Sequence, residues 1–282
     1  MTPERKSKDG ATLPSDVDPT PITAVGLLVA LVGFELLDRL RRAAADRTSS
    51  ASTGDTPPAP TRATELREHV WKWAVPAVLL LVVALEGNSL ASIGWRIESI
   101  ERLVWQIGVG LAAMLGLNMF TAPLWARVGD GGESLASGLG SFAALSIPER
   151  LFVAFTAGAT EETAFHGYAL ERLLALTGSP PVAAGISFLA FTAGHAGDTW
   201  DREAVLRIAQ PALVTTLLYL WFRSLPALIA IHALNDAVGL LLAELYTPDD
   251  GAGESGAGTG ADADTDADDP DDSTAVGWLR GE

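Results

Sequence analysis

The chain has 282 residues, of which 48% are hydrophobic, and its formal net charge at pH 7 is −16. It contains no cysteine, which excludes disulfide bonds, thiolate nucleophiles and cysteine-ligated zinc. The acidic balance and the presence of only three lysines (Lys6, Lys8 and Lys72) argue against a nucleic-acid partner.

Long apolar runs alternate with polar segments along the chain. Because about 20 residues at a rise of 1.5 Å per residue cross the hydrocarbon core, apolar stretches of about 18 residues or more predict membrane spans. About seven such stretches are present, covering residues 21–38, 74–92, 103–124, 148–170, 181–197, 206–222 and 225–246. The predicted fold class is all-α: a polytopic transmembrane helical bundle of about seven spans (six to eight), with disordered polar N- and C-terminal tails.

The polar segments divide the chain into predicted parts. These are a polar N-terminal tail (1–20), a peripheral transmembrane anchor (21–40), a Ser/Thr/Pro-rich linker (41–70), a compact bundle (71–247) and an acidic tail (248–282). The first span ends in FELLDRLRR without a small-residue cleavage site, so we interpret it as an anchor rather than a removed signal peptide. Basic residues on both sides of this span leave the membrane orientation open.

Acidic residues are concentrated near the C-terminus. Ten of the 35 fall between Asp249 and Asp272, among Gly, Ala and Thr. Such a segment cannot bury apolar surface and is predicted to be disordered. Its composition is typical of an acidic, solvating tail in a high-salt cytoplasm, as in a halophilic archaeon, although an interaction tail has the same composition.

Turn signals delimit the central helices. Residues 126–147 are rich in Gly and Ser and predict a loop, and Pro148 is suited to the first turn of the helix that follows. The sequence Gly178-Ser179-Pro180-Pro181 then predicts the end of one helix and the start of the next.

A glutamate pair lies inside the apolar run 148–170, in the sequence AGATEETAFHGYALER. Glu162 and His166 are four residues apart and share a helix face, whereas Glu161 is offset by about 100°. One carboxylate can therefore point at a reaction centre while its neighbour hydrogen-bonds a positioning partner. The alternative is that the pair is solvated at a helix end, against which the flanking aromatic and aliphatic residues argue.

Two later apolar segments also carry polar groups. His195 ends the run GISFLAFTAGH, and His232 precedes Asp236 by four residues in HALND, so that the carboxylate can orient the imidazole. Asn235, three residues from His232, can serve the same face. Each group taken alone is also compatible with a buried polar contact that fixes helix register.

Together these groups are typical of a site that activates water, because polar groups at membrane depth are costly and usually functional. A desolvated glutamate can act as general base while two imidazoles stabilise an oxyanion. Alternatively, Glu161, His195 and His232 can hold a divalent metal such as zinc, whose bound hydroxide would be the nucleophile. The usual HExxH motif of zinc peptidases is absent. Both chemistries end in hydrolysis, and the cofactor stays open.

EETAFHGYALERL, FTAGH and HALND, in this order on successive apolar segments, resemble the three motifs of the CPBP family, the CAAX protease and bacteriocin-processing (Abi) intramembrane peptidases. The resemblance covers roughly residues 90–245 and is strongest over 148–240. It implies an intramembrane hydrolase that cleaves a membrane-associated substrate, which in the eukaryotic members is a prenylated C-terminal peptide.

The resemblance also implies roles by position. Glu161 matches the glutamate that activates water and Glu162 the second, supporting glutamate. His195 and His232 match the histidines of the second and third motifs, and Asp236 falls where the family has Asn or Asp. His166 stands where the family has Arg, which is a departure because histidine is charged only when protonated. We expect His166 to substitute for the arginine in part, to add a metal ligand, or to mark relaxed function.

Three functions follow as hypotheses. The first is an intramembrane endopeptidase, probed by Glu161→Ala and His232→Ala. The second is a non-catalytic scaffold or pseudoprotease that binds lipid-modified peptides, and the third is a proton- or metal-coupled transporter, against which the absence of repeat symmetry argues. The expected partners are the lipid bilayer and a membrane-embedded or lipid-modified peptide, and the expected location is the cell membrane.

Overall fold

The structure is a computed structural model that describes residues 19–49, 62–127, 138–196 and 202–246. Most of the predicted N-terminal tail and the whole predicted acidic tail lie outside these residues. Every described regular element is a helix, which confirms the all-α fold class. The α-helices are α1 (Pro21–Ser49), α2 (Arg62–Lys72), α3 (Ala74–Leu85), α4 (Ile100–Trp125), α6 (Ile147–Glu162), α7 (Glu171–Thr177), α8 (Pro180–Ala193), α9 (Arg202–Phe222) and α10 (Leu225–Leu241).

Short helical turns join or extend these elements. They are the 3₁₀ turns η1 (Leu90–Ile93), η2 (Ser141–Ala144) and η4 (Ala243–Tyr246), and the π-helix η3 (Thr163–Leu170) between α6 and α7. The helix end and restart predicted at residues 178–181 are confirmed, since α7 ends at Thr177 and Pro180 begins α8. Gly178 permits this ending because it adopts the left-handed conformation, with φ of 63°.

Four stretches of helix in the described part of the chain are long and apolar enough to cross a membrane. They are Pro21–Ala45, Arg62–Leu85, Ile100–Trp125 and Arg202–Phe222, and the shorter apolar helices Pro180–Ala193 and Leu225–Leu241 accompany them. Each of the predicted spans overlaps a helix, but the run 148–170 is not among these stretches. The protein is therefore a polytopic helical membrane protein, as the apolar runs predicted.

The predicted linker 41–70 is helical at both ends. Helix α1 extends into the first part of this segment and ends at Ser49, and α2 begins at Arg62. Residues 50–61 lie outside the described part. Helical continuation is physically reasonable because residues 41–47, RRAAADR, are strong helix formers. The linker prediction therefore missed two helical segments.

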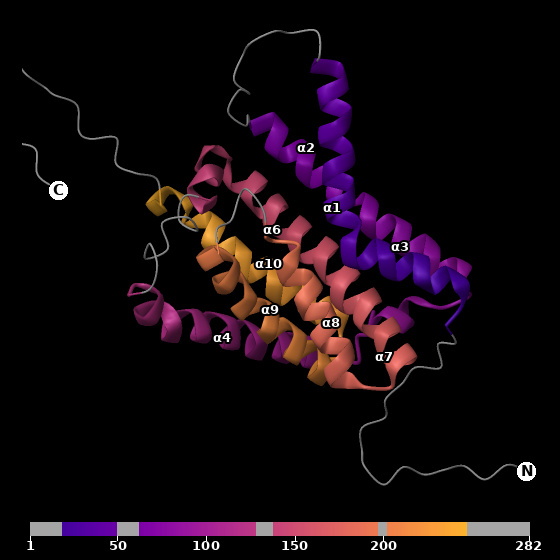
Figure 1. Cartoon of the computed structure of the whole chain (residues 1–282). Coiled ribbons are helices and arrows are strands. Elements are labelled where there is room, and N and C mark those ends of the chain that lie inside the picture. The colour runs from indigo at the N-terminus through magenta and orange to yellow at the C-terminus, as the bar shows by residue number, and fades with distance from the viewer. Residues whose placement is uncertain (1–18, 50–61, 128–137, 197–201, 247–282) are drawn as a thin grey trace, which may run out of the picture. The chain divides into compact units, whose positions relative to one another are not determined.

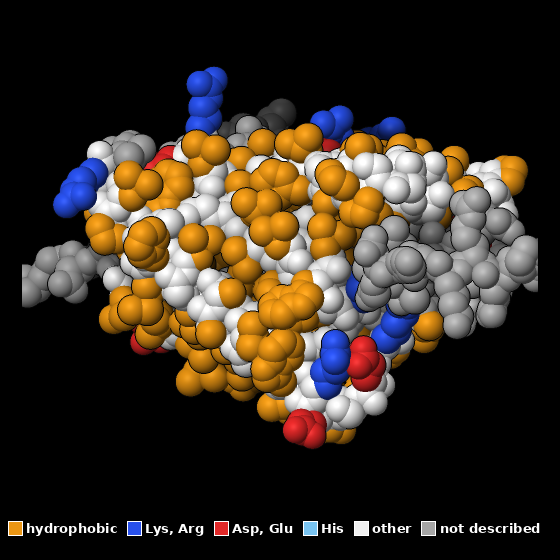
Figure 2. Space-filling view, turned by 90° about the horizontal axis from the view of Figure 1, so that it is seen from below, with side chains coloured by type: hydrophobic (Ala, Val, Ile, Leu, Met, Phe, Trp, Pro, Cys, Tyr) orange, Lys and Arg blue, Asp and Glu red, His pale blue; other side chains and the backbone are white. Residues whose placement is uncertain are grey.

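Exposed apolar side chains cover much of the described surface. Figure 2 shows one face on which hydrophobic side chains predominate and charged side chains lie mainly toward the margins. Leu28, Val104, Phe120 and Leu217 are each more than half exposed, at 60%, 62%, 85% and 57%. Exposed apolar area of this extent favours contact with lipid.

The helix formed by α6, η3 and α7 is the most buried part of the bundle. Every residue from Gly158 to Leu174 is buried, including the charged or titratable Glu161, Glu162, His166 and Arg172. The π-helix at its centre interrupts the regular α-helical spacing, and such segments occur frequently at functional sites. The polar groups predicted from the sequence therefore face the interior of the bundle.

The Glu86 carboxylate at the end of α3 forms a buried ion pair with the central helix and also accepts a hydrogen bond from α1. Arg172 donates from Nη2 to Glu86 Oε2 at 2.5 Å, and neither side chain is exposed. Tyr168 and Thr23 donate to the same carboxylate at 2.9 and 2.7 Å. Because Thr23 lies on α1, the helix predicted as a peripheral anchor is packed onto the bundle. No local sequence pattern predicted this pairing across 86 residues.

Helices α6 and α10 lie side by side, as Figure 1 shows, and they approach most closely at Gly158. A Cβ atom on this glycine would lie 2.9 Å from the nitrogen of Ala233 and 3.0 Å from the carbonyl oxygen of Ile229. Both are backbone atoms that cannot rotate away. The missing side chain therefore sets the distance between the two helices that carry Glu161, Glu162 and His232.

Replacing Gly158 by alanine is expected to lower the free energy of unfolding by about 1–3 kcal/mol, because overpacking forces the two backbones apart. The matched control is Gly108→Ala on α4, where no atom lies within 4 Å of the added Cβ. Thermal unfolding of both variants in detergent measures the difference. Equal stability of the two variants would contradict a backbone-limited contact.

Candidate active site

Glu162 lies at the centre of a buried polar cluster. Its Oε1 is 2.6 Å from His232 Nδ1 on α10, and its Oε2 is 2.5 Å from His166 Nδ1 on η3. The first contact is a hydrogen bond, whereas the second has the separation of an ion pair without hydrogen-bond alignment. No part of the Glu162 side chain is exposed. One carboxylate thus joins two histidines from different helices.

The hydrogen bonds of His166 constrain its protonation state. Thr216 donates its hydroxyl proton to the carbonyl oxygen of Ala212 at 2.8 Å, so its oxygen accepts from His166 Nε2 at 2.9 Å. With Nε2 as a donor, Nδ1 carries a second proton only in the imidazolium form. The ion pair with Glu162 therefore requires the imidazolium form of His166 beside a carboxylate. A protonated His166 supplies the positive charge that arginine would supply at this position.

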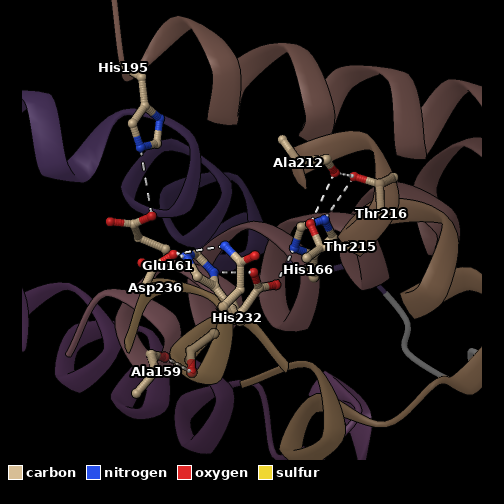
Figure 3. A network of polar contacts seen from close by, with 12 residues as sticks. Ala159, Glu161, His166, His195, Ala212, Thr215, Thr216, His232 and Asp236 are labelled. Carbon is tan, nitrogen blue, oxygen red and sulfur yellow. Dashed lines mark hydrogen bonds and ion pairs between the residues drawn. The ribbon is translucent and has the colours of Figure 1, made fainter. Parts of the chain in front are cut away.

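Glu161 points away from this inner cluster, as the helical offset predicted. Its Oε1 accepts from Lys72 Nζ at 3.1 Å, and its Oε2 lies 3.9 Å from His195 Nε2 (Figure 3). The Nδ1 of His195 donates to the carbonyl oxygen of Phe191 at 2.9 Å. This bond fixes the ring so that Nε2 faces the Glu161 carboxylate.

His232 connects the inner and outer groups. Besides its bond to Glu162 through Nδ1, its Nε2 lies 3.3 Å from Asp236 Oδ2, one helical turn further along α10. The predicted pairing of His232 with Asp236 is therefore present. Both ring nitrogens face a carboxylate oxygen, which favours the imidazolium form and leaves neither nitrogen free. His232 therefore has no free N–H with which to donate directly to an oxyanion, contrary to the expectation from the sequence.

Asn235 does not contact His232, although three residues separate them. Its Nδ2 donates to Asp236 Oδ1 at 3.3 Å, and its Oδ1 accepts from Asn118 Nδ2 on α4 at 3.4 Å. The expectation that Asn235 serves the His232 face is thus met only indirectly, through Asp236.

Exposure divides these groups into two layers. The side chains of Lys72, Asp236 and His195 are 34%, 31% and 24% exposed, and Glu161 beneath them is 9% exposed. Behind these groups, Glu162 and His166 are completely buried. The outer layer can meet a substrate and water, whereas the inner layer can act only through its neighbours.

A metal site was one of the two alternatives drawn from the sequence. Within the described ranges, no three His, Asp or Glu side chains are arranged so as to hold a metal ion. The two ring nitrogens of His232 each face a carboxylate, and His195 presents only Nε2. The donor set as it stands does not fit the proposed zinc triad of Glu161, His195 and His232. No catalytic step is therefore derived through a metal.

Two contacts of the site could not be expected from the sequence. Lys72 lies between Trp71 and Trp73 near the end of α2, and its ammonium group contacts Glu161. Its rarity, as one of three lysines in the chain, was the available signal. The bond between Glu162 and His232 spans 70 residues and has no local signature.

The fold and the site together define a class: a helical membrane protein with a buried glutamate–histidine centre. Residues 143–238 match the family model described as type II CAAX prenyl endopeptidase Rce1-like, and this range contains all three sequence motifs. This match supports the resemblance to the CPBP (CAAX protease) family that the three motifs indicate. Comparison with curated proteins and with solved structures finds no match to this chain.

Proposed function

We propose that the protein is an intramembrane endopeptidase that cleaves a peptide bond in a membrane-associated, lipid-modified substrate at the cell membrane. The single observation that carries this proposal is the Glu161 carboxylate, which lies between Lys72 and His195 in the partly exposed outer layer of the site. The family match supports the hydrolase class. A prenylated C-terminal peptide is the substrate that the family description favours.

The proposed reaction begins with water beside Glu161. The carboxylate takes a proton as the water oxygen bonds to the scissile carbonyl carbon, and the carbonyl oxygen becomes an oxyanion. Lys72 and protonated His195 stabilise this negative charge, with the His232 imidazolium adding its field. When the tetrahedral intermediate collapses, the C–N bond breaks and Glu161 returns its proton to the leaving amine.

The inner layer supports this chemistry without touching the substrate. Glu162 fixes the His232 ring through Nδ1, and Asp236 holds the other nitrogen. His166 neutralises the charge of Glu162, so a carboxylate can stay buried. In this proposal His166 takes the place of the family's arginine as the positively charged support, with Asn235 supporting Asp236.

Chelation is expected to leave cleavage intact, because the donor groups at the site do not converge on a metal. The purified protein is reconstituted in liposomes with a farnesylated peptide and its unprenylated counterpart, with and without EDTA, and products are mapped by mass spectrometry. Cleavage that disappears with EDTA and returns with zinc would contradict the glutamate mechanism. Binding of the farnesylated peptide without any product would favour the non-catalytic scaffold instead.

A further inference from the structure

A pocket rich in arginine lies away from the Glu161 centre. It is lined by three arginines from separate parts of the chain: Arg96 after η1, Arg102 on α4 and Arg223 between α9 and α10. Glu98 is the only carboxylate among the residues that line it. The excess of guanidinium groups makes this pocket suited to an anion.

Arg223 lines this pocket and is anchored by an ion pair behind it. Its Nη2 donates to the buried carboxylate of Glu171 at 2.5 Å, which anchors the guanidinium. Its Nε is buried and has no hydrogen-bond partner among the described residues. The exposed part of the side chain, 18% of its area, leaves a guanidinium nitrogen at the pocket for an acceptor.

The backbone around Arg223 holds this arrangement in place. Arg223 has φ of 51° and is the only non-glycine residue with positive φ in the described part of the chain. The next residues are fixed, because Ser224 Oγ donates to the Arg96 carbonyl at 2.9 Å and the Leu225 nitrogen donates to the Gly94 carbonyl at 2.7 Å. Strain of this kind persists where surrounding contacts maintain it, often at binding sites.

The other two arginines are available to a ligand. Arg102 pairs with Glu98 at 3.1 Å, but both side chains are more than half exposed, at 52% and 63%, so this pair is weak. Arg96 is bound through Nε to the carbonyl oxygen of Ala91 at 3.0 Å, which leaves its terminal nitrogens for other acceptors.

Exposed tryptophans near this pocket favour a position at the depth of lipid headgroups. Trp95 precedes Arg96 and is 48% exposed, while Trp105 and Trp221 pack edge to face and are 49% and 61% exposed. Exposed tryptophans of membrane proteins gather at the membrane interface. Ile100, at the start of α4, is 70% exposed and can meet acyl chains.

We propose that Arg96, Arg102 and Arg223 form a binding site for the headgroup phosphate of an anionic phospholipid. The phosphate oxygens accept from the terminal nitrogens of Arg96, Arg102 and Arg223, while the acyl chains lie along the apolar surface beside Ile100. A zwitterionic headgroup fits less well, since its own cation is repelled by the three guanidinium groups. This site is independent of the proposed peptidase activity.

The test is native mass spectrometry of the detergent-solubilised protein with phosphatidylglycerol, with phosphatidylcholine, or with inorganic phosphate. Phosphatidylglycerol is expected to bind more tightly than phosphatidylcholine, and Arg96→Gln or Arg223→Gln is expected to weaken its binding by about tenfold. The control is Arg127→Gln, which removes one exposed arginine just beyond the other end of α4. This control is expected to bind the lipid like the wild type.

Three results would overturn this proposal. They are equal weakening by Arg127→Gln, equal binding of the two lipids, and inorganic phosphate that binds as tightly as phosphatidylglycerol, which would indicate a site for the free anion. Loss of the Arg223 ion pair with Glu171 can destabilise the fold, so unfolding temperatures of all variants are measured in parallel. Arg96 forms no direct ion pair among the described residues, although its charge acts on Glu171 at longer range, so Arg96→Gln decides the outcome if Arg223→Gln does not fold.

Discussion

Replacing Glu161 by glutamine is expected to lower the rate of peptide cleavage by about 10²–10⁴-fold, because a general base contributes a factor of this size. Glutamine has nearly the same shape but cannot accept the proton of the attacking water. The substitution removes one charge from the outer layer, where Lys72 is 34% exposed and can stay solvated. The fold should therefore be retained.

The matched control is a carboxylate outside the site, on the same face of α2 as Lys72. Glu68 lies on α2, four residues before Lys72, and its side chain is 46% exposed with a long 3.5 Å contact to Arg41. Glu68→Gln is expected to cleave at the wild-type rate. Cleavage is followed with a fluorogenic lipidated peptide in liposomes, and helix content by circular dichroism. Wild-type cleavage by Glu161→Gln would remove Glu161 from the mechanism.

Breaking the ion pair between Glu162 and His166 is expected to lower the free energy of unfolding by about 3–5 kcal/mol, because it leaves an uncompensated buried charge. The change is His166→Gln, which removes the cation beside a carboxylate that has no exposed area. Cleavage should fall with it, since Glu162 would no longer fix the His232 ring in the same way. The unfolding temperature in detergent and the cleavage rate are both measured.

A double-mutant cycle isolates the pair itself. Glu162→Gln together with His166→Gln is expected to cost less than the sum of the single changes, because no unpaired charge then remains. Glu35 and Arg39 on α1 provide the control, since they have the same four-residue spacing and a 2.6 Å contact but are 48% and 74% exposed. Their coupling should not exceed about 0.5 kcal/mol. Equal coupling in the two pairs would show that burial does not strengthen the Glu162 contact.

The sequence predicted the apolar helices and the motif residues well, because both depend on local patterns. Helical spacing alone placed Glu161 and Glu162 on different faces, and the structure has them in different layers. It also predicted the contact of His232 with Asp236. These relations hold within one or two turns of a single helix.

What the sequence did not predict depends on packing between helices. The bond of Glu162 to His232 and the contact of Lys72 with Glu161 join residues 70 and 89 positions apart. The hydrogen bond from His166 Nε2 to Thr216 determines which ring nitrogen carries a proton, and the apolar pattern of α9 does not predict this contact. Such contacts are fixed by the tertiary arrangement, and no residue spacing encodes them.

The burial of the central helix also bears on the biosynthesis of the protein. The helix of α6, η3 and α7 is not among the four stretches apolar enough to insert alone, and it carries Glu162, His166 and Glu171. Thr216, Tyr219 and His232, which bind these groups, follow it in the chain. During translation these polar groups reach the bilayer before their partners exist. We therefore expect stable membrane integration of the helix to await α9 and α10, whose side chains complete the buried polar cluster.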